Sequence, residues 1–198
     1  MIERMASLEE KRQVILAQEQ QVAELLAAKV LDKPKPNIWM ILIPILFVFY
    51  LNDYKKYKEG RMAFAGHFLV TAKKALEEAA AVVQSGKVAD PQALARESGL
   101  SAAGQERLAE LFALLIEHYG RLLRAGGDDF NSLVRSSYPS QPDYQFFLDR
   151  LNQAEKNLNL ALKPQLDTTT AGVNDILSAI ENQAAQIRRQ KAQEIFGP

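Results

Sequence analysis

The chain has 198 residues, enough for one sizeable domain or two small ones, with 24 basic side chains, 24 acidic side chains and no cysteine. Zero net charge gives no general attraction to nucleic acid or to an acidic partner. Without cysteine the chain forms no disulfide, thiolate metal site or cysteine nucleophile.

The first predicted element is an amphipathic helix within residues 1–36. Ser7 and Glu10 have capping-box spacing, in which each side chain accepts a hydrogen bond from the amide of the other residue. Arg12 and Glu19 interrupt the apolar stripe that follows, so a long self-sufficient coiled coil is not expected. The stripe recurs mostly every three or four residues, at Leu8, Ile15, Leu16, Val22, Leu26 and Val30.

The next segment, residues 38–51, contains fourteen apolar residues and no charge. A proline-containing hinge at 33–37 separates it from the first helix, because proline lacks an amide hydrogen and disfavours helix in the residue before it. A helix over 37–54 would be about 27 Å long, slightly short of a hydrocarbon core of about 30 Å. The positions that mark this predicted membrane segment are Ile38, Trp39, Pro44, Phe47, Tyr50 and Leu51.

Basic and aromatic side chains flank the apolar run. Tyrosine and tryptophan are typical of membrane–water interfaces. Each cation near anionic lipid contributes about 1 kcal/mol of attraction. We therefore expect the bilayer to be a partner, with its anionic headgroups held by the flanks. The flank residues are Lys33, Lys35, Tyr54, Lys55, Lys56, Tyr57, Lys58 and Arg61.

Three interpretations of the apolar run stay open. It spans the bilayer as one helix, it turns back at Pro44 as a re-entrant hairpin, or it packs in a protein core or against partner subunits. Three basic groups lie shortly before the run and four shortly after it, so the positive-inside rule gives almost no orientation. A cleaved signal peptide is disfavoured, because 37 residues of mixed charge precede the run.

The rest of the chain shows helical patterns and no strand pattern. Residues 55–86 read as a basic juxtamembrane helix that stops at Ser85-Gly86, and 87–198 as a C-terminal helical domain. Within that domain, 126–142 reads as a turn-rich connection. The helices expected there cover about 90–98, 101–125, 143–162 and 173 onwards. The sequence thus predicts an all-α, membrane-anchored protein whose C-terminal helical bundle lies on the cytoplasmic face.

Residues 90–108 resemble the helix-turn-helix of DNA-binding regulators. An alanine in the first helix is followed four residues later by Gly99 in the turn. Gln105 stands where that motif has a β-branched packing residue, and Arg107 is the one cation on the candidate recognition face. Because several cations are needed for phosphate contacts, DNA binding is the weakest of the functional alternatives.

The polar residues predict no catalytic site, metal or cofactor. A di-iron bundle needs a glutamate three residues before each histidine, but Phe64 and Leu115 precede His67 and His118. We expect His118 at the boundary of the core. Asp128-Asp129 lacks the spaced oxygens of an EF-hand and is expected to cap the next helix.

The preferred functional prediction is a non-enzymatic, membrane-anchored scaffold or accessory subunit. It would act through helix–helix contacts with a partner protein or with copies of itself. The alternative is a membrane-interface enzyme or lipid-binding protein with a re-entrant segment, using polar groups such as Asp53, Glu59 and His67.

Overall fold

The computed structural model describes residues 6–31, 60–165 and 173–197, and every regular element in these ranges is helical. The all-α prediction is therefore confirmed for the part of the chain that is described. In chain order the elements are α1 (Leu8–Leu31), α3 (Gly60–Ser85), α4 (Pro91–Arg96), α5 (Ala102–Arg124), α6 (Phe130–Ser137), α7 (Gln141–Leu162), the 3-10 turn η1 (Lys163–Gln165) and α8 (Val173–Phe196).

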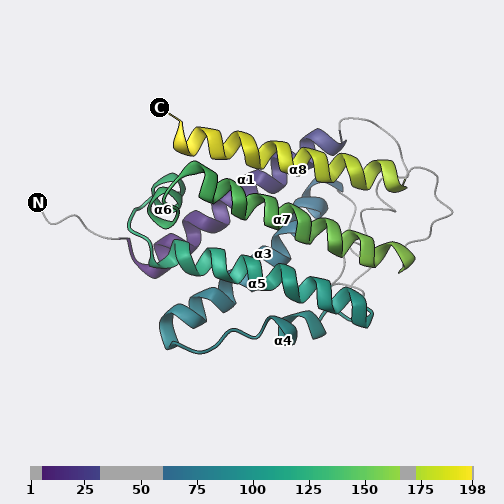
Figure 1. Cartoon of the computed structure of the whole chain (residues 1–198), viewed down its shortest axis with the longest axis horizontal. Coiled ribbons are helices and arrows are strands. Elements are labelled where there is room, and N and C mark those ends of the chain that lie inside the picture. Colours follow the sequence, from purple (N-terminus) through teal and green to yellow (C-terminus); the bar gives the residue numbers. More distant parts are fainter. Residues whose placement is uncertain (1–5, 32–59, 166–172, 198) are drawn as a thin grey trace, which may run out of the picture.

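The long helices pack around one hydrophobic core. Figure 1 shows α5, α7 and α8 side by side, with α1 and α3 crossing behind them. α5 packs against α3 and α7, and α8 packs against α7 and α1. Ile15 of α1 and Leu76 of α3 lie in the same core as Phe112 of α5. The described parts of 1–36 and 55–86, which the sequence suggests as separate units, therefore share a core with residues 87–198.

Local capping interactions begin several helices where the sequence predicts. The Ser7 amide donates to Glu10 Oε2 at 2.7 Å, and the Glu10 amide donates to Ser7 Oγ at 3.2 Å. Asp90 Oδ1 accepts from the Ala93 amide at 2.9 Å at the start of α4. These contacts satisfy amides that have no partner within the helix, which stabilises each first turn.

The connection predicted as turn-rich contains a helix, α6. Asp129 Oδ1 accepts from the Ser132 amide at 2.9 Å, while Ser132 Oγ accepts from the Asp129 amide at 3.2 Å. The capping role expected of Asp128-Asp129 is therefore confirmed for Asp129. The turn-rich prediction was wrong because eight residues hold too few turns for helical periodicity to stand out among glycine, aspartate and serine.

Lys11 fixes α1 against the C-terminal end of α5. Its side chain is buried, and its ammonium group donates to the carbonyl oxygens of Leu123 at 3.3 Å and Ala125 at 2.6 Å. Carbonyls at the end of a helix have no partner within it and carry partial negative charge, so a cation is favourable there. The contact explains how a lysine sits on the buried face of an amphipathic helix.

The predicted membrane segment, residues 37–54, lies outside the described ranges. This applies to Ile38, Trp39, Pro44, Phe47, Tyr50 and Leu51, and to the flanking residues Lys33, Lys35, Tyr54, Lys55, Lys56, Tyr57 and Lys58. Arg61 is in the first turn of α3. None of the described helices combines the length and apolar character needed to cross a bilayer.

Candidate ligand-binding cavity

A cavity of about 170 Å³ lies between α1, α3, α5, α7 and α8. A buried apolar cavity of about 150 Å³ holds a benzene molecule, so this one has room for a ring-sized group. Its wall is mainly aliphatic and aromatic. The apolar lining residues are Val22, Leu26, Ala72, Leu108, Leu111, Leu115, Phe130, Phe147, Leu148, Leu151, Leu158, Leu177, Ile180 and Ala184.

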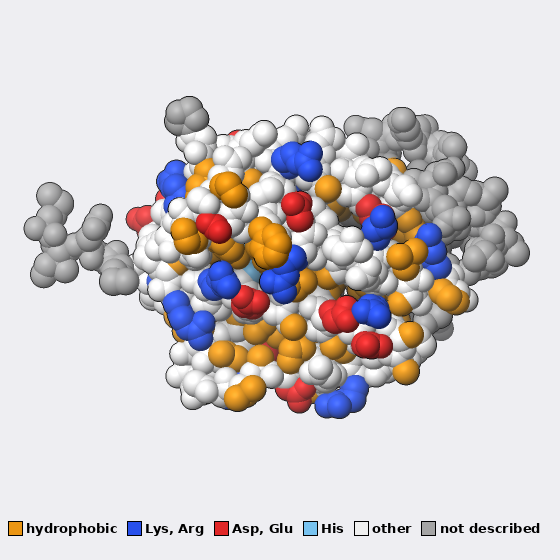
Figure 2. Space-filling model, viewed as in Figure 1, with side chains coloured by type: hydrophobic (Ala, Val, Ile, Leu, Met, Phe, Trp, Pro, Cys, Tyr) orange, Lys and Arg blue, Asp and Glu red, His pale blue; other side chains and the backbone are white. Residues whose placement is uncertain are grey.

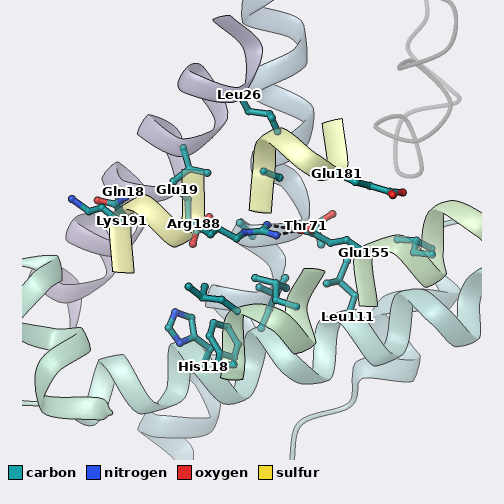
Figure 3. Close-up of a pocket in the computed structure, with 18 of the residues that line it drawn as sticks. Gln18, Glu19, Leu26, Thr71, Leu111, His118, Glu155, Glu181, Arg188 and Lys191 are labelled. Carbon is teal, nitrogen blue, oxygen red and sulfur yellow. Dashed lines mark hydrogen bonds and ion pairs between the residues drawn. The ribbon is translucent and has the colours of Figure 1, made fainter. Parts of the chain in front are cut away.

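A buried ion pair forms one part of the polar lining. Arg188 of α8 is 8% exposed, and its guanidinium donates to both carboxylate oxygens of Glu155 on α7, each at 2.6 Å. The same guanidinium also donates to Asn152 Oδ1. Figure 3 shows Arg188 near the centre of the cavity. The charge of Arg188 is thus matched by a partner on the neighbouring helix, as a buried cation requires.

Glu19 and Tyr119 form the second polar group of the cavity. The pKa of the Glu19 carboxyl is raised above its ordinary value of 4.5, because burial disfavours the charged form. Tyr119 on α5 is 0% exposed, and its hydroxyl forms no hydrogen bond of normal length and angle with any described residue. Burial raises the Tyr119 pKa well above 10, and the nearby Glu19 carboxyl adds to this through its charge and a weak hydrogen bond. The Tyr119 phenol therefore keeps its proton.

His118 lies in the wall of the cavity, and the prediction that it sits at the core boundary was wrong. It is 4% exposed, its Nδ1 is 2.7 Å from the Tyr138 hydroxyl oxygen, and its ring stacks on Phe147 with centroids 4.2 Å apart. Burial lowers the His118 pKa to about 3, so the ring is neutral at pH 7. The periodicity of α5 does not show that Tyr138, which follows α6 in the chain, packs over this histidine.

Half-exposed polar residues surround the cavity. They are Gln18, Thr71, Asn159, Glu181 and Lys191. Asn159 Nδ2 on α7 donates to Glu181 Oε1 on α8 at 3.0 Å. Figure 3 shows Gln18 and Lys191 on one side of Arg188 and Glu181 on the other. An apolar interior with a polar rim is typical of sites for small, largely apolar molecules.

The helix-turn-helix-like residues fold into α4, a turn with Gly99 at φ +69°, and α5. Gln105 Nε2 donates to the Leu100 carbonyl at 2.7 Å and so holds the turn. Glu106 and Glu110 are exposed near the start of α5, and Arg107 pairs with Glu110 at 2.6 Å. Figure 2 shows acidic and basic side chains interspersed on the visible face. This acidic helix start does not suit contact with DNA phosphates.

Asp53 and Glu59 lie outside the described ranges, whereas His67 belongs to α3. Among the described residues, no three histidine, aspartate or glutamate side chains lie close enough to hold a metal ion.

Sequence reasoning did not identify Glu19, Tyr119 and Arg188 as site residues. Glu19 gave a signal, because it interrupts an otherwise apolar stripe of the first helix. Arg188 directly follows Ile187, a buried apolar residue of α8, and Tyr119 lies among the buried apolar residues of α5. A polar residue on or beside a buried stripe needs a partner, but its partner here comes from another helix.

Comparisons with models of protein families, with curated proteins and with solved structures found no match to this chain.

Proposed function

We propose that this chain is a non-enzymatic, membrane-anchored helical protein that binds a ring-sized apolar ligand in the cavity between α1, α3, α5, α7 and α8. The observation that carries the proposal is the 170 Å³ cavity with its mainly apolar wall. Burial of a ring in such a wall is driven by removal of apolar surface from water. A non-enzymatic role is proposed because the sequence contains no recognisable catalytic motif.

Filling the cavity tests this proposal. Ala184 on α8 is buried and lines the cavity, so Ala184→Phe places a ring where the ligand would lie. Ala179 is an exposed residue on the same helix and does not line the cavity, so Ala179→Phe is the matched control. The probe is α-methylstyrene, an uncharged hydrocarbon of ring size, and its affinity for the full chain is measured by ligand-observed NMR.

We expect α-methylstyrene to bind the unmodified chain and Ala179→Phe equally, and to bind Ala184→Phe at least tenfold more weakly. Circular dichroism and thermal unfolding establish that each variant is folded. If Ala184→Phe does not fold, Ala184→Leu, which fills less of the space, takes its place. Absence of binding to the unmodified chain, or equal binding to a filled and an unfilled cavity, would overturn the proposal.

The membrane part of the proposal is supported by the apolar run at 38–51 and its basic flanks. We expect the chain to stay with membranes during carbonate extraction. Single cysteines placed before residue 37 and after residue 52 distinguish a spanning segment, with the sites on opposite sides, from a hairpin, with both on one side. The second cysteine also reports whether the C-terminal helices face the cytoplasm. Complete release by carbonate would contradict integral anchoring.

Binding to a partner protein or to copies of the chain is a second candidate, favoured by exposed apolar side chains on α7. Phe146 is 66% exposed and Leu160 is 49% exposed. The stripes of α1, α5, α7 and α8 largely pack on one another, however, and so are not free to act as a scaffold surface. Affinity capture in mild detergent tests this candidate. Recovery of the chain alone and monomeric would count against it.

A further inference from the structure

We infer that the ligand of this cavity carries a neutral hydrogen-bond acceptor, such as a ketone or ester carbonyl, and that the Tyr119 hydroxyl donates to it. This inference rests on the proposed ligand-binding function and specifies the chemical class of the ligand. It starts from one atom, the Tyr119 hydroxyl oxygen, which is buried in the cavity wall and whose contact with the Glu19 carboxyl falls short of normal hydrogen-bond geometry.

The Tyr119 hydroxyl is suited to donate a hydrogen bond, because it does not ionise. The phenol keeps its proton in this buried position, and the whole residue is 0% exposed. A buried donor without a good partner costs free energy, because it has lost its hydrogen bonds to water. An acceptor oxygen on a molecule in the cavity would give this hydroxyl a hydrogen bond of normal geometry, in place of its weak contact with the Glu19 carboxyl.

The charges around the cavity favour an uncharged ligand. An anion inside the cavity would need Arg188, but both carboxylate oxygens of Glu155 already accept from this guanidinium. Lys191, the other cation of the lining, is half-exposed and pairs with Glu194 at 3.4 Å.

Of the carboxyls that could hold a cation, Glu155 pairs with Arg188, and Glu181 is half-exposed and accepts from Asn159. Burial favours the neutral form of the third, Glu19, and the positive charge of Arg188 lies nearby. A carbonyl oxygen accepts a hydrogen bond and brings no charge into the apolar interior, so its desolvation costs least.

The test compares two ligands of nearly the same shape. Acetophenone has a carbonyl oxygen where α-methylstyrene has a methylene group, so the pair isolates the acceptor. Each affinity is measured by ligand-observed NMR for the unmodified chain, for Tyr119→Phe, and for Tyr138→Phe as control. Tyr138 also has a buried hydroxyl, but that group bonds to His118 and Tyr138 does not line the cavity.

We expect Tyr119→Phe to weaken acetophenone about tenfold relative to α-methylstyrene, a change of about 1.4 kcal/mol. Tyr138→Phe should leave the ratio of the two affinities unchanged. If Tyr119→Phe changes both affinities equally, the carbonyl inference is overturned while ligand binding stands. If neither ligand binds, the proposed function itself fails. Benzylamine is the third probe. If benzylamine binds more tightly than acetophenone and Glu19→Gln abolishes this preference, the ligand carries a cation and the inference of a neutral acceptor is overturned.

Discussion

Arg188 on α8 donates two parallel hydrogen bonds to the Glu155 carboxylate on α7, Nη1 to Oε2 and Nη2 to Oε1, each 2.6 Å long. The Arg188 side chain is 9% exposed and that of Glu155 is 25% exposed. The planar guanidinium fork matches the two carboxylate oxygens, so the pair sets both the distance and the orientation between the two helices. It also gives the cavity a fixed polar wall.

Glu155→Gln is expected to lower the free energy of unfolding by about 2 kcal/mol, because it leaves the buried Arg188 charge without its counter-ion. The matched control is Glu117→Gln, which breaks an exposed pair with Arg121 of the same 2.6 Å length on α5. That exposed pair should contribute less than about 0.5 kcal/mol. Urea denaturation measures both changes. Equal losses in the two variants would show that burial of the Arg188 pair has no energetic consequence.

Glu19→Gln is expected to stabilise the chain at pH 7. The folded-state pKa of Glu19 lies above its ordinary 4.5, so this group favours folding most below pH 4.5 and loses that contribution as pH rises through the higher folded value. Glutamine has nearly the same shape and no charge, so the gain in unfolding free energy over the unmodified chain should grow with pH. Denaturation at pH 4.5 and pH 7.5 measures it. A gain that shrinks with rising pH would contradict the raised pKa.

His118 gives the opposite dependence on pH. Its pKa is lowered from 6.5 to about 3, so the unfolded chain binds a proton between these values while the folded chain does not. The stability that His118 contributes is complete above pH 6.5 and falls as pH decreases, by at most about 1.4 kcal/mol per pH unit. His118→Asn removes this titration, so its unfolding free energy should fall less steeply between pH 6.5 and pH 4.5. Parallel slopes for the two proteins would show that the buried imidazole becomes protonated without unfolding.

Gly127→Ala is expected to destabilise the chain by about 2–3 kcal/mol. Gly127 has φ +130°, and an added Cβ would meet the Ser132 Cβ at 2.8 Å, within the capping turn of α6. Gly86 also has a positive φ, +68°, but nothing lies within 4 Å of an added Cβ there. Gly86→Ala should therefore cost only about 1 kcal/mol, from backbone strain alone. Thermal unfolding compares the two, and an equal loss would exclude the contact with Ser132 as a cause.

The residues that determine local structure could be interpreted from the sequence because their partners are close in the chain. Ser7 with Glu10, and Asp90 before Pro91, predict helix starts that the structure contains. Stripes of apolar residues predict the long helices for the same reason, since one helical turn spans only three to four residues. The exception is α6, which is too short to show a stripe and follows residues typical of turns.

The candidate site could not be predicted in this way, because its parts lie far apart in the chain. Glu19, Tyr119 and Arg188 come from α1, α5 and α8, and each helix by itself shows only which of its faces is apolar. Which faces meet depends on how five helices pack, and that packing leaves the 170 Å³ cavity. The sequence by itself thus determined the long helices, several helix caps and the apolar run at 38–51. Only the tertiary structure decided which polar groups share a cavity, because side-chain partners across helices are set by packing rather than by neighbours in the chain.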